Sequence, residues 1–462
     1  MKYRRRGEAG YVLILVAVSL PVFLGMLGLG IDVGYLRYMK WRMQAAADAA
    51  AVGGAHALLY SAAAKAAEDV VMSARRDAEK NGFDYQTPGV TVTVNNPPSA
   101  LSPCSQKSYK NYCVEVIVSQ PQRTFFMKVF GWTTVPVSAR AVGILWTGPN
   151  CMYALNGTQA GTFKLTPGGG GYEVRTNCGI VVNSSSPAAM NPGTNHLYAG
   201  SIGIVGGCSG CGSNVTPTPT TRIPTVSDPL AYLPEPTVSG PVRANPNITA
   251  PGNYTLQPGN YTNGLTIGAQ GTVTCKTIDG VKTCTSNGVA GPVVTFASGN
   301  YYITGGTFSV DGPKSDNDNN DGLAYLHPSL KGTEVFFDIG ASAQVAIMGG
   351  GNGSFVNSYN GGLSAPTVGT YAGILFWQSR ATPLLSYTAR ASSGLGDGWT
   401  GALYFPTVGL RYGNSNPNAA KYMILVAQTI ELYRDMATVE MINYDTSGLL
   451  GGSPIKRAVL SE

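Results

Sequence analysis

The stretch PGNYT at residues 258–262 occurs three times in closely similar form in this 462-residue chain. PGNYT also stands at 251–255, and SGNYY stands at 298–302. The copies that begin at 258 and 298 lie 40 residues apart, which corresponds to two turns of a solenoid with about 20 residues per coil. Each copy leads into an apolar strand, such as 335–339, and strands of this size bury a shared core when coils stack. The pattern predicts a right-handed parallel β-helix, and a β-sandwich with long loops is the alternative.

Composition agrees with a mainly β protein. The chain has 60 Gly and 29 Pro, only 12% charged residues and 44% hydrophobic residues. These values exclude a coiled coil, a helical bundle and a charged disordered tail, and they favour many short strands joined by turns. The net charge is +6, but most of it lies before residue 44. The remaining body lacks the basic footprint of a nucleic-acid-binding protein.

The chain divides into six predicted segments. They are a basic N-terminus (1–10), a transmembrane helix (11–31), an Ala-rich helical extension (32–61), a small α+β domain (62–148), a Gly/Pro-rich β region with a connector (149–247) and a β-solenoid domain (248–462).

The 21 residues at 11–31 carry no charge and form a helix about 31 Å long, enough to cross a bilayer. The basic residues Lys2, Arg4, Arg5 and Arg6 precede it, so the positive-inside rule places the N-terminus in the cytoplasm and the body outside. A cleaved signal peptide is the alternative, although the apolar run is long for one. The expected topology is therefore single-pass, with the N-terminus in the cytoplasm.

Small residues line part of this predicted span. Gly25, Gly28, Gly30 and Gly34 would allow another membrane helix to approach closely. Asp32 follows the span directly, and we expect its charge to be solvated without a buried partner.

The order of features in the first 55 residues is specific. A basic cluster is followed by an apolar span containing Pro21, then by GLGIDVG with Asp32, and then by QAAADAAA, which contains Gln44 and Asp48. This order resembles the N-terminal signature of the TadE/TadG-like proteins of Flp, or tight-adherence, pilus assembly. The resemblance implies a component of a pilus or secretion apparatus that is anchored in the bacterial inner membrane, with other assembly proteins as partners. Its body would be periplasmic or at the cell surface. The chain lacks the Glu that a type IV prepilin site has at the fifth mature position, because Val12 or Leu15 stands there.

A small α+β domain is expected after the anchor. A helix over 62–80 has a polar side, and alternating apolar residues predict strands around 90–94, 114–118 and 135–139. The aromatic cluster at 125–130 is expected in the core of this domain. The apolar segment 422–432 is expected to be a buried strand of a late coil.

All eight cysteines follow the predicted span, which indicates disulfides in an oxidising compartment. Nearest-neighbour pairing is one hypothesis among 105: Cys104 with Cys113, Cys151 with Cys178, Cys208 with Cys211, and Cys275 with Cys284. The CxxC at 208–211 could instead be redox-active or half of a metal site, but an isolated pair favours a structural bridge.

Evidence for cofactors or catalysis is thin. Asp316, Asp318 and Asp321 resemble part of a calcium loop, but no Glu stands at its last position, and a solvated turn is favoured. The three histidines, at 56, 196 and 327, fall in no catalytic or metal-binding spacing. We therefore expect a non-enzymatic protein without a cofactor. The alternatives are a surface adhesin and a carbohydrate-active β-helix enzyme, which would need clustered carboxylates and aromatics.

Overall fold

The computed structural model describes residues 9–58, 66–99, 104, 113–147, 150–166, 173–268, 273–278, 281–286, 291–311, 328–347, 362–393, 399–414, 422–433, 438–441 and 455–460. These residues form two compact units. One comprises Met1–Trp146 with Lys456–Glu462, and the other comprises Thr147–Ile455. The predicted class, mainly β with a long apolar N-terminal helix, is confirmed.

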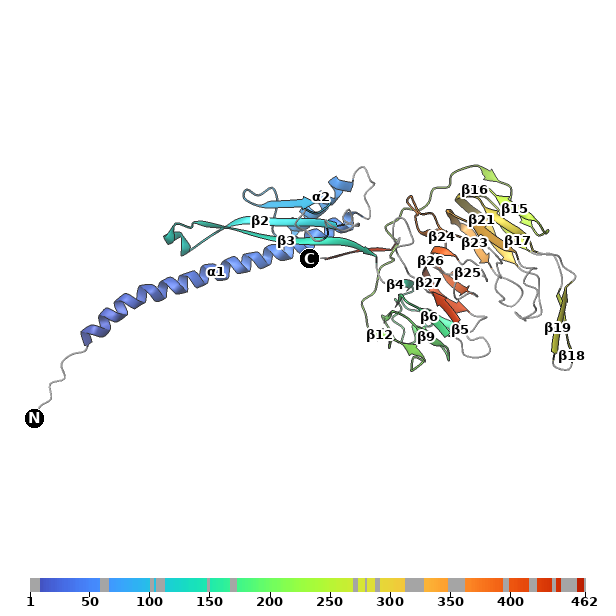
Figure 1. The fold of residues 1–462 in the computed structure, drawn as a ribbon, viewed down its shortest axis with the longest axis horizontal. Helices are drawn as coiled ribbons and strands as arrows, with labels where there is room; N and C mark the ends of the chain where they lie inside the picture. The colour runs from blue at the N-terminus through green and yellow to red at the C-terminus, as the bar shows by residue number, and fades with distance from the viewer. Residues whose placement is uncertain are drawn as a thin grey trace, which may run out of the picture. The chain divides into compact units, whose positions relative to one another are not determined.

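The first unit is built on one long helix, α1 (Ala9–Ala57), which joins the predicted span and the Ala-rich extension without a break (Figure 1). Pro21 lies inside the helix, and helical structure continues on both sides of it. Apolar side chains before residue 34 are exposed, for example Leu24 at 57% and Leu27 at 66%. Among the described residues, α1 is the one helix long and apolar enough to cross a membrane.

The second half of α1 packs on a four-stranded sheet in the order β1-β2-β3-β29. The strands are β1 (Thr91–Asn95), β2 (Cys113–Arg123), β3 (Thr134–Thr147) and β29 (Lys456–Leu460). β1, β2 and β3 pair antiparallel. Residues 456–460 were expected in the solenoid, but this strand completes the sheet of the first unit. A five-residue strand without a partner edge of its own gains its hydrogen bonds by joining an existing sheet.

A second helix, α2 (Ala66–Lys80), also belongs to this unit. Its residues Val70, Ala74 and Ala78 follow one another at intervals of four, so they lie on one face, and all three are fully buried. They join the alanines of α1 and the valines of β2 in one core.

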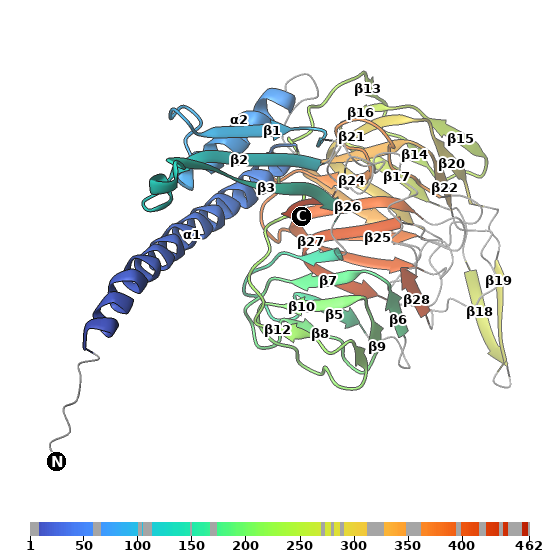
Figure 2. The same cartoon turned by 60° about the vertical axis from the view of Figure 1, so that its left-hand side comes forward.

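Parallel ladders make up the second unit (Figure 2). The first ladder runs in the order β12 (Thr220–Thr221), β10 (Ser201–Ile204), β7 (Gly179–Val182), β4 (Asn150–Ala154), β27 (Tyr422–Tyr433), β26 (Thr400–Asn414), β24 (Ile374–Gln378), β23 (Val335–Ile347), β21 (Gly299–Asp311), β16 (Gly259–Tyr261), β13 (Val242–Arg243).

The long strands bend into a second ladder with β8 (Met190–Asn191), β5 (Phe163–Thr166), β25 (Thr388–Ser393), β17 (Gly264–Gly268) and β14 (Asn247–Ile248). Two further parallel groups are β11 (Val215–Thr216), β9 (His196–Tyr198), β6 (Glu173–Thr176) and β28 (Thr438–Met441), and β15 (Asn253–Leu256), β20 (Val293–Phe296) and β22 (Ser329–Gly332). A separate antiparallel hairpin consists of β18 (Val273–Ile278) and β19 (Val281–Ser286).

The chain enters the first ladder in the middle. From β4 it winds through β7 and β10 to β12 at one end, and it resumes at β13, the opposite end. It then winds back through β16 and β21 until β27 pairs with β4. A strand of the first coil therefore pairs with a strand of one of the last coils. Residues 222–241 connect the two ends of the ladder.

The repeated GNY motif occupies the same kind of corner in each copy, but the spacing of 40 residues does not correspond to two coils. Gly259 pairs directly with Tyr301, so the two copies lie in neighbouring coils and not two coils apart. The extra length arises because the β18–β19 hairpin and β20 lie between them. Gly259 and Gly299 have φ values of +147° and +137°, where a side chain is strained, and a Cβ on Gly259 would lie 2.5 Å from the Pro241 carbonyl oxygen.

The tyrosines of the motif close the same corner in each copy. The hydroxyls of Tyr254, Tyr261 and Tyr301 each donate a hydrogen bond to the carbonyl oxygen four residues earlier, at 3.2, 2.7 and 2.7 Å. Tyr261 and Tyr301 are buried, and their rings stack with centroids 6.0 Å apart. The aromatic body thus fills the core while its polar tip satisfies a turn carbonyl.

Aromatic side chains continue this stacking along the core. Phe337 and Phe376 are register partners on β23 and β24, and their rings stack at 4.8 Å. Trp399 lies next to Phe376 at 5.5 Å. The segment predicted as a late buried strand is β27, whose described side chains are largely buried.

Candidate functional site

The junction between α1 and the β2–β3 hairpin is centred on Asp32. Its carboxylate accepts hydrogen bonds from the backbone N–H groups of Phe125, Phe126 and Met127 at 2.8, 2.8 and 2.6 Å. These groups open the short 3₁₀ helix η3 (Met127–Phe130), whose first N–H groups have no partner within the helix. The expectation of a solvated Asp32 is wrong: the side chain is fully buried and caps the hairpin. The sequence gives no local sign of a partner about 90 residues away.

Two further contacts hold the hairpin on the helix. The ring of Phe125 meets that of Tyr35 edge-on, with centroids 5.4 Å apart, and the Tyr35 hydroxyl bonds to the Gln122 side chain at 3.2 Å. Gly28 faces Phe126, because a Cβ at that position would lie 2.6 Å from the ring. Gly28 is therefore used to admit the hairpin of the same chain.

The aromatic cluster at 125–130 was expected in the core of the first unit, and this expectation is wrong. Phe125 is 52% exposed and Phe130 is 69% exposed, and Trp132 beyond them is 62% exposed. The alternation of the β2 and β3 strands ends before this segment, so its side chains have no sheet face to pack on. Apolar composition alone did not distinguish a core strand from a hairpin tip.

The Ala-rich half of α1 packs directly on the sheet. Gln44 donates to the Arg140 carbonyl oxygen at 2.9 Å and to the Asp48 carboxylate at 2.8 Å. Gly143 of β3 faces the helix backbone, and a Cβ there would lie 2.2 Å from the Ala51 carbonyl oxygen. The small residues of the QAAADAAA segment thus serve close contact between helix and sheet within this chain.

A buried charge lies on the same sheet. The Glu115 carboxylate accepts hydrogen bonds from Asn95 at 2.8 Å, from the backbone and hydroxyl of Ser99 at 3.0 and 2.9 Å, and from Arg140 at 2.5 Å. Burial by itself would raise the pKa of Glu115, but these donors outweigh it and lower the pKa to about 2. Glu115 therefore stays ionised and holds the 95–99 segment on the sheet through its two ends, Asn95 and Ser99.

The other predicted helix-packing glycines are open. Among described atoms, nothing lies within 4 Å of a Cβ placed on Gly25, Gly30 or Gly34. Gly30 and Gly34 are four positions apart and share one face of α1, whereas Gly25 lies on another. The use of any of these open positions for contact with another helix remains a prediction.

Three of the predicted cysteine pairs are disulfides: Cys104–Cys113, Cys151–Cys178 and Cys208–Cys211. The CxxC is thus a bridge within one tight loop. The backbone positions of Cys275 and Cys284 stand opposite each other in the β18–β19 hairpin, and their pairing remains a prediction.

No cluster of metal-ligating side chains occurs within the described part of the chain. The calcium candidates Asp316, Asp318 and Asp321 lie outside the described residues, as does His327. His56 and His196 lie on α1 and β9, in different units.

A cluster of charged and aromatic side chains surrounds Arg380 in the second unit. Arg380 stacks over Trp377 at 4.6 Å and donates to the carbonyl oxygens of Leu230 and Leu233 at 2.8 and 2.9 Å. Tyr404 donates to Asp228 at 2.6 Å. The partners at 228–233 belong to the connector between the two ends of the ladder, so this cluster holds the connector against the coils.

Asp338 lies beside this cluster, buried on β23. Burial, together with the nearby negative charge of Glu235, raises the pKa of Asp338 to about 7. Burial and the same two carboxyl groups also raise the pKa of Tyr371 to about 12. These residues are far apart in sequence, and the strand pattern around Asp338 gave no reason to single it out.

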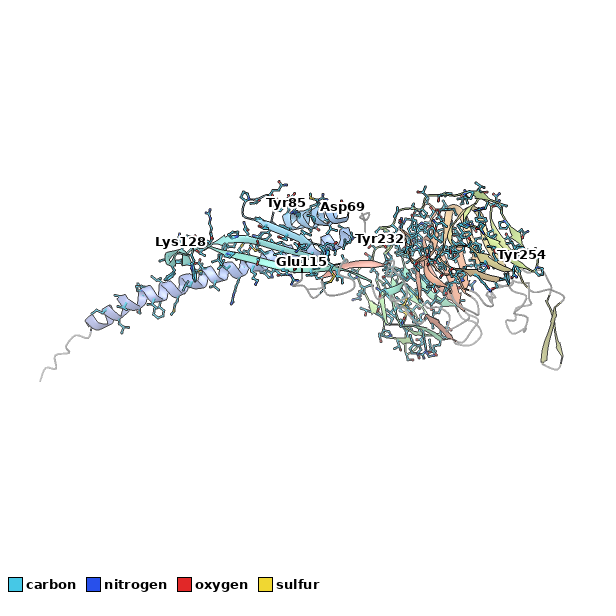
Figure 3. All side chains as sticks on the ribbon, turned by 45° about the horizontal axis from the view of Figure 1, so that its top comes forward. Asp69, Tyr85, Glu115, Lys128, Tyr232 and Tyr254 are labelled. Atoms are coloured by element: carbon cyan, nitrogen blue, oxygen red, sulfur yellow. A yellow bond between two sulfur atoms is a disulfide. The ribbon has the colours of Figure 1, made fainter. Side chains whose placement is uncertain are left out.

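Figure 3 shows how side chains of the first unit are arranged, with Glu115 on the sheet and Lys128 at the far end of the hairpin. Asp32, Gln44 and Asp48, three residues of the N-terminal signature, all lie on the part of α1 that packs on the hairpin and sheet of the same unit. Asp32 and Gln44 contact the hairpin and the sheet directly, while Asp48 holds Gln44.

Comparison with known proteins agrees with this placement. Residues 10–57 match the Tad family model, which is described as Flp pilus-assembly TadE/G-like. No curated protein and no solved structure matches the chain significantly. The match covers nearly the whole of α1 and includes Pro21, Asp32, Gln44 and Asp48. The N-terminal helix of this chain is therefore similar to the TadE/G-like segment of Flp pilus-assembly proteins.

Proposed function

We propose that this chain is a non-enzymatic component of Flp-type pilus assembly, anchored by α1 in the bacterial inner membrane. Its N-terminus faces the cytoplasm, and its β-rich body makes protein contacts outside. The observation that carries the proposal is that the two halves of α1, the helix matched by the family model, have different surroundings. One half of α1 exposes apolar side chains, while one face of the other half is buried against a sheet of the same chain.

Orientation is supported by charge and by sulfur chemistry. Lys2 and Arg4–Arg6 precede the apolar half of α1, and basic residues are retained on the cytoplasmic side. The disulfides of both units would persist in an oxidising compartment such as the periplasm.

The body supports a scaffold better than a catalyst. We infer that the second unit is a right-handed parallel β-helix, on the strength of its parallel ladders and the right-handed rule for parallel crossovers. Its prominent aromatic and charged cluster is occupied by the connector, through Arg380, Trp377 and Asp228. The alternatives, a surface adhesin and a carbohydrate-active enzyme, would need such a cluster to face a ligand.

Pilus production tests the proposal. A strain lacking this chain is expected to lose Flp-type filaments from the sheared surface fraction, and the full chain should restore them. A matched chain in which a cleavable signal peptide replaces residues 1–31 should be exported and fail to restore them. Normal filaments with loss of attachment would instead identify an adhesin, and normal filaments with accumulated surface polysaccharide would identify an enzyme.

Membrane location has a separate test. Mass spectrometry of the membrane fraction should find an N-terminus that retains the apolar run. A mature protein beginning near the Ala-rich segment at 45–47 would identify a signal peptide and contradict the anchor.

A further inference from the structure

The tip of the β2–β3 hairpin is a strongly apolar surface without cover in the described chain. We define the hairpin tip as residues 124–133. Val129 is 80% exposed, and Phe130, Trp132, Phe125 and Phe126 are exposed at 69%, 62%, 52% and 43%. Exposure of large apolar side chains to water is unfavourable, and a group of them on one surface marks a contact site.

The tip has a fixed conformation, although it packs on little. Thr124 and Thr133 pair through the backbone at 3.1 Å, and the Thr124 hydroxyl donates to the Trp132 carbonyl oxygen. Gly131 ends η3 with φ of +91°, which a side chain would strain. Together with the three N–H bonds to Asp32, these contacts hold the aromatic side chains outward before any partner binds.

The position of the tip along α1 identifies its surroundings. Its contacts are with Gly28, Asp32 and Tyr35, the stretch where the uncharged run 11–31 ends. Leu24 and Leu27 just before this stretch are 57% and 66% exposed on the helix, and Ile31 within it is 55% exposed. The exposed apolar surface of the tip is thus continuous with that of the anchor.

The chemistry of the tip matches the boundary of a bilayer. Trp and Phe are favoured where acyl chains meet head groups, and Lys128 adds a cation that can reach anionic head groups along its apolar stem. The nearest carboxylate, Asp32, is satisfied by backbone donors, so its charge does not face the lipid as a bare group.

We propose that the hairpin tip inserts into the outer interfacial layer of the membrane that α1 crosses, as a second point of attachment. The inserted tip then fixes how deeply α1 lies in the membrane. It also prevents α1 and the sheet packed on it from rotating together about the helix axis. This inference rests on α1 being a membrane anchor, and its occupant is lipid, not another protein.

Depth measurement in lipid alone tests the inference. The full chain, with Val129→Cys labelled with an environment-sensitive fluorophore, would be reconstituted in vesicles of phosphatidylcholine and phosphatidylglycerol. One set of vesicles contains lipids with the quencher near the head group, and a second set contains lipids with the quencher deep in the acyl chain. Leu20→Cys, inside the apolar run, serves as the buried control, and Gln86→Cys, on an exposed loop of the same unit, serves as the aqueous control. Unsubstituted chain measures background labelling.

The inference expects quenching at position 129 at least about threefold above that at position 86, from the shallow quencher lipids. Quenching at 20 but not at 129 would overturn tip insertion while leaving the anchor intact, and would assign the tip to a protein partner. Absence of quenching at both positions would overturn the anchor itself. Trp132→Cys gives a second label on the tip, so that failure of one variant to fold does not decide the outcome.

Discussion

The carboxylate of Asp32 on α1 accepts a hydrogen bond of 2.8 Å from the backbone N–H of Phe126, 94 residues later. This contact joins the family segment to the hairpin of the first unit. It places a charged group at the end of an apolar run and satisfies it with main-chain donors, which do not depend on the identity of the side chains in the tip.

Asp32→Asn keeps the size of the side chain but replaces one acceptor oxygen by a donor. The backbone N–H groups of residues 125–127 should lose acceptors, because a terminal amide NH₂ cannot accept their bonds. We expect their hydrogen exchange to become at least about tenfold faster in detergent-solubilised full-length chain. Asp48→Asn is the matched control, since Asp48 on the same helix accepts a side-chain hydrogen bond from Gln44 and does not cap the hairpin. Equal effects of the two variants would contradict the capping role.

Gly143→Ala should separate α1 from the sheet. The new Cβ would meet the Ala51 carbonyl oxygen at 2.2 Å, and a backbone atom can give way only if the helix moves. The free energy of unfolding of the first unit should fall by about 1–3 kcal/mol. Gly34→Ala, where nothing lies within 4 Å, should leave it unchanged or slightly raised. Thermal unfolding followed by circular dichroism measures both, and a neutral Gly143→Ala would show that the close packing is not required.

Glu115 should make the first unit sensitive to acid. Its folded pKa, about 2, lies below the unfolded value of 4.5, so its contribution is complete above pH 4.5 and is lost as the pH falls toward 2. The shift corresponds to at most about 3 kcal/mol of stability. Glu115→Gln should be less stable at neutral pH and should show a flatter dependence between these two values. Parallel curves for the two proteins would contradict this account.

Asp338 should act in the opposite direction. Its folded pKa, about 7, lies above the unfolded value of 3.8, so the folded state favours the neutral acid and stability falls as the pH rises through this range. Asp338→Asn should be more stable than the parent above pH 7, and the gain should shrink toward pH 4 because the parent acid is then neutral. Denaturant unfolding of the full chain at the two ends of this range provides the measurement. A gain that does not change with pH would indicate repacking instead.

The disulfides should differ in strength with the length of the loop that they close. Replacing both Cys151 and Cys178, separated by 27 positions, should cost about 3.5 kcal/mol by the chain-entropy relation. Replacing Cys208 and Cys211, separated by 3, should cost about 2 kcal/mol. Unfolding of the alanine double variants under non-reducing conditions tests the order, and the reverse order would show that local packing dominates.

The sequence by itself determined the long apolar N-terminal helix, the mainly β class and the three disulfide pairings seen. An uncharged run of 21 residues is long enough to cross a bilayer whatever surrounds it, and short strands separated by Gly and Pro follow from local backbone preference. Cysteines close in sequence meet in short loops, so nearest-neighbour pairing held for 104 with 113, 151 with 178, and 208 with 211.

Tertiary structure decided what depended on distant partners. Asp32 is buried because a hairpin about 90 residues away supplies three N–H groups, and the aromatics at 125–130 are exposed because they form that hairpin's tip. The chain enters its ladder in the middle, and β29 joins the first unit, because strand edges are completed by whichever segment the fold brings alongside. Sequence periodicity reports which face of a strand is apolar, but it does not report which neighbour covers that face.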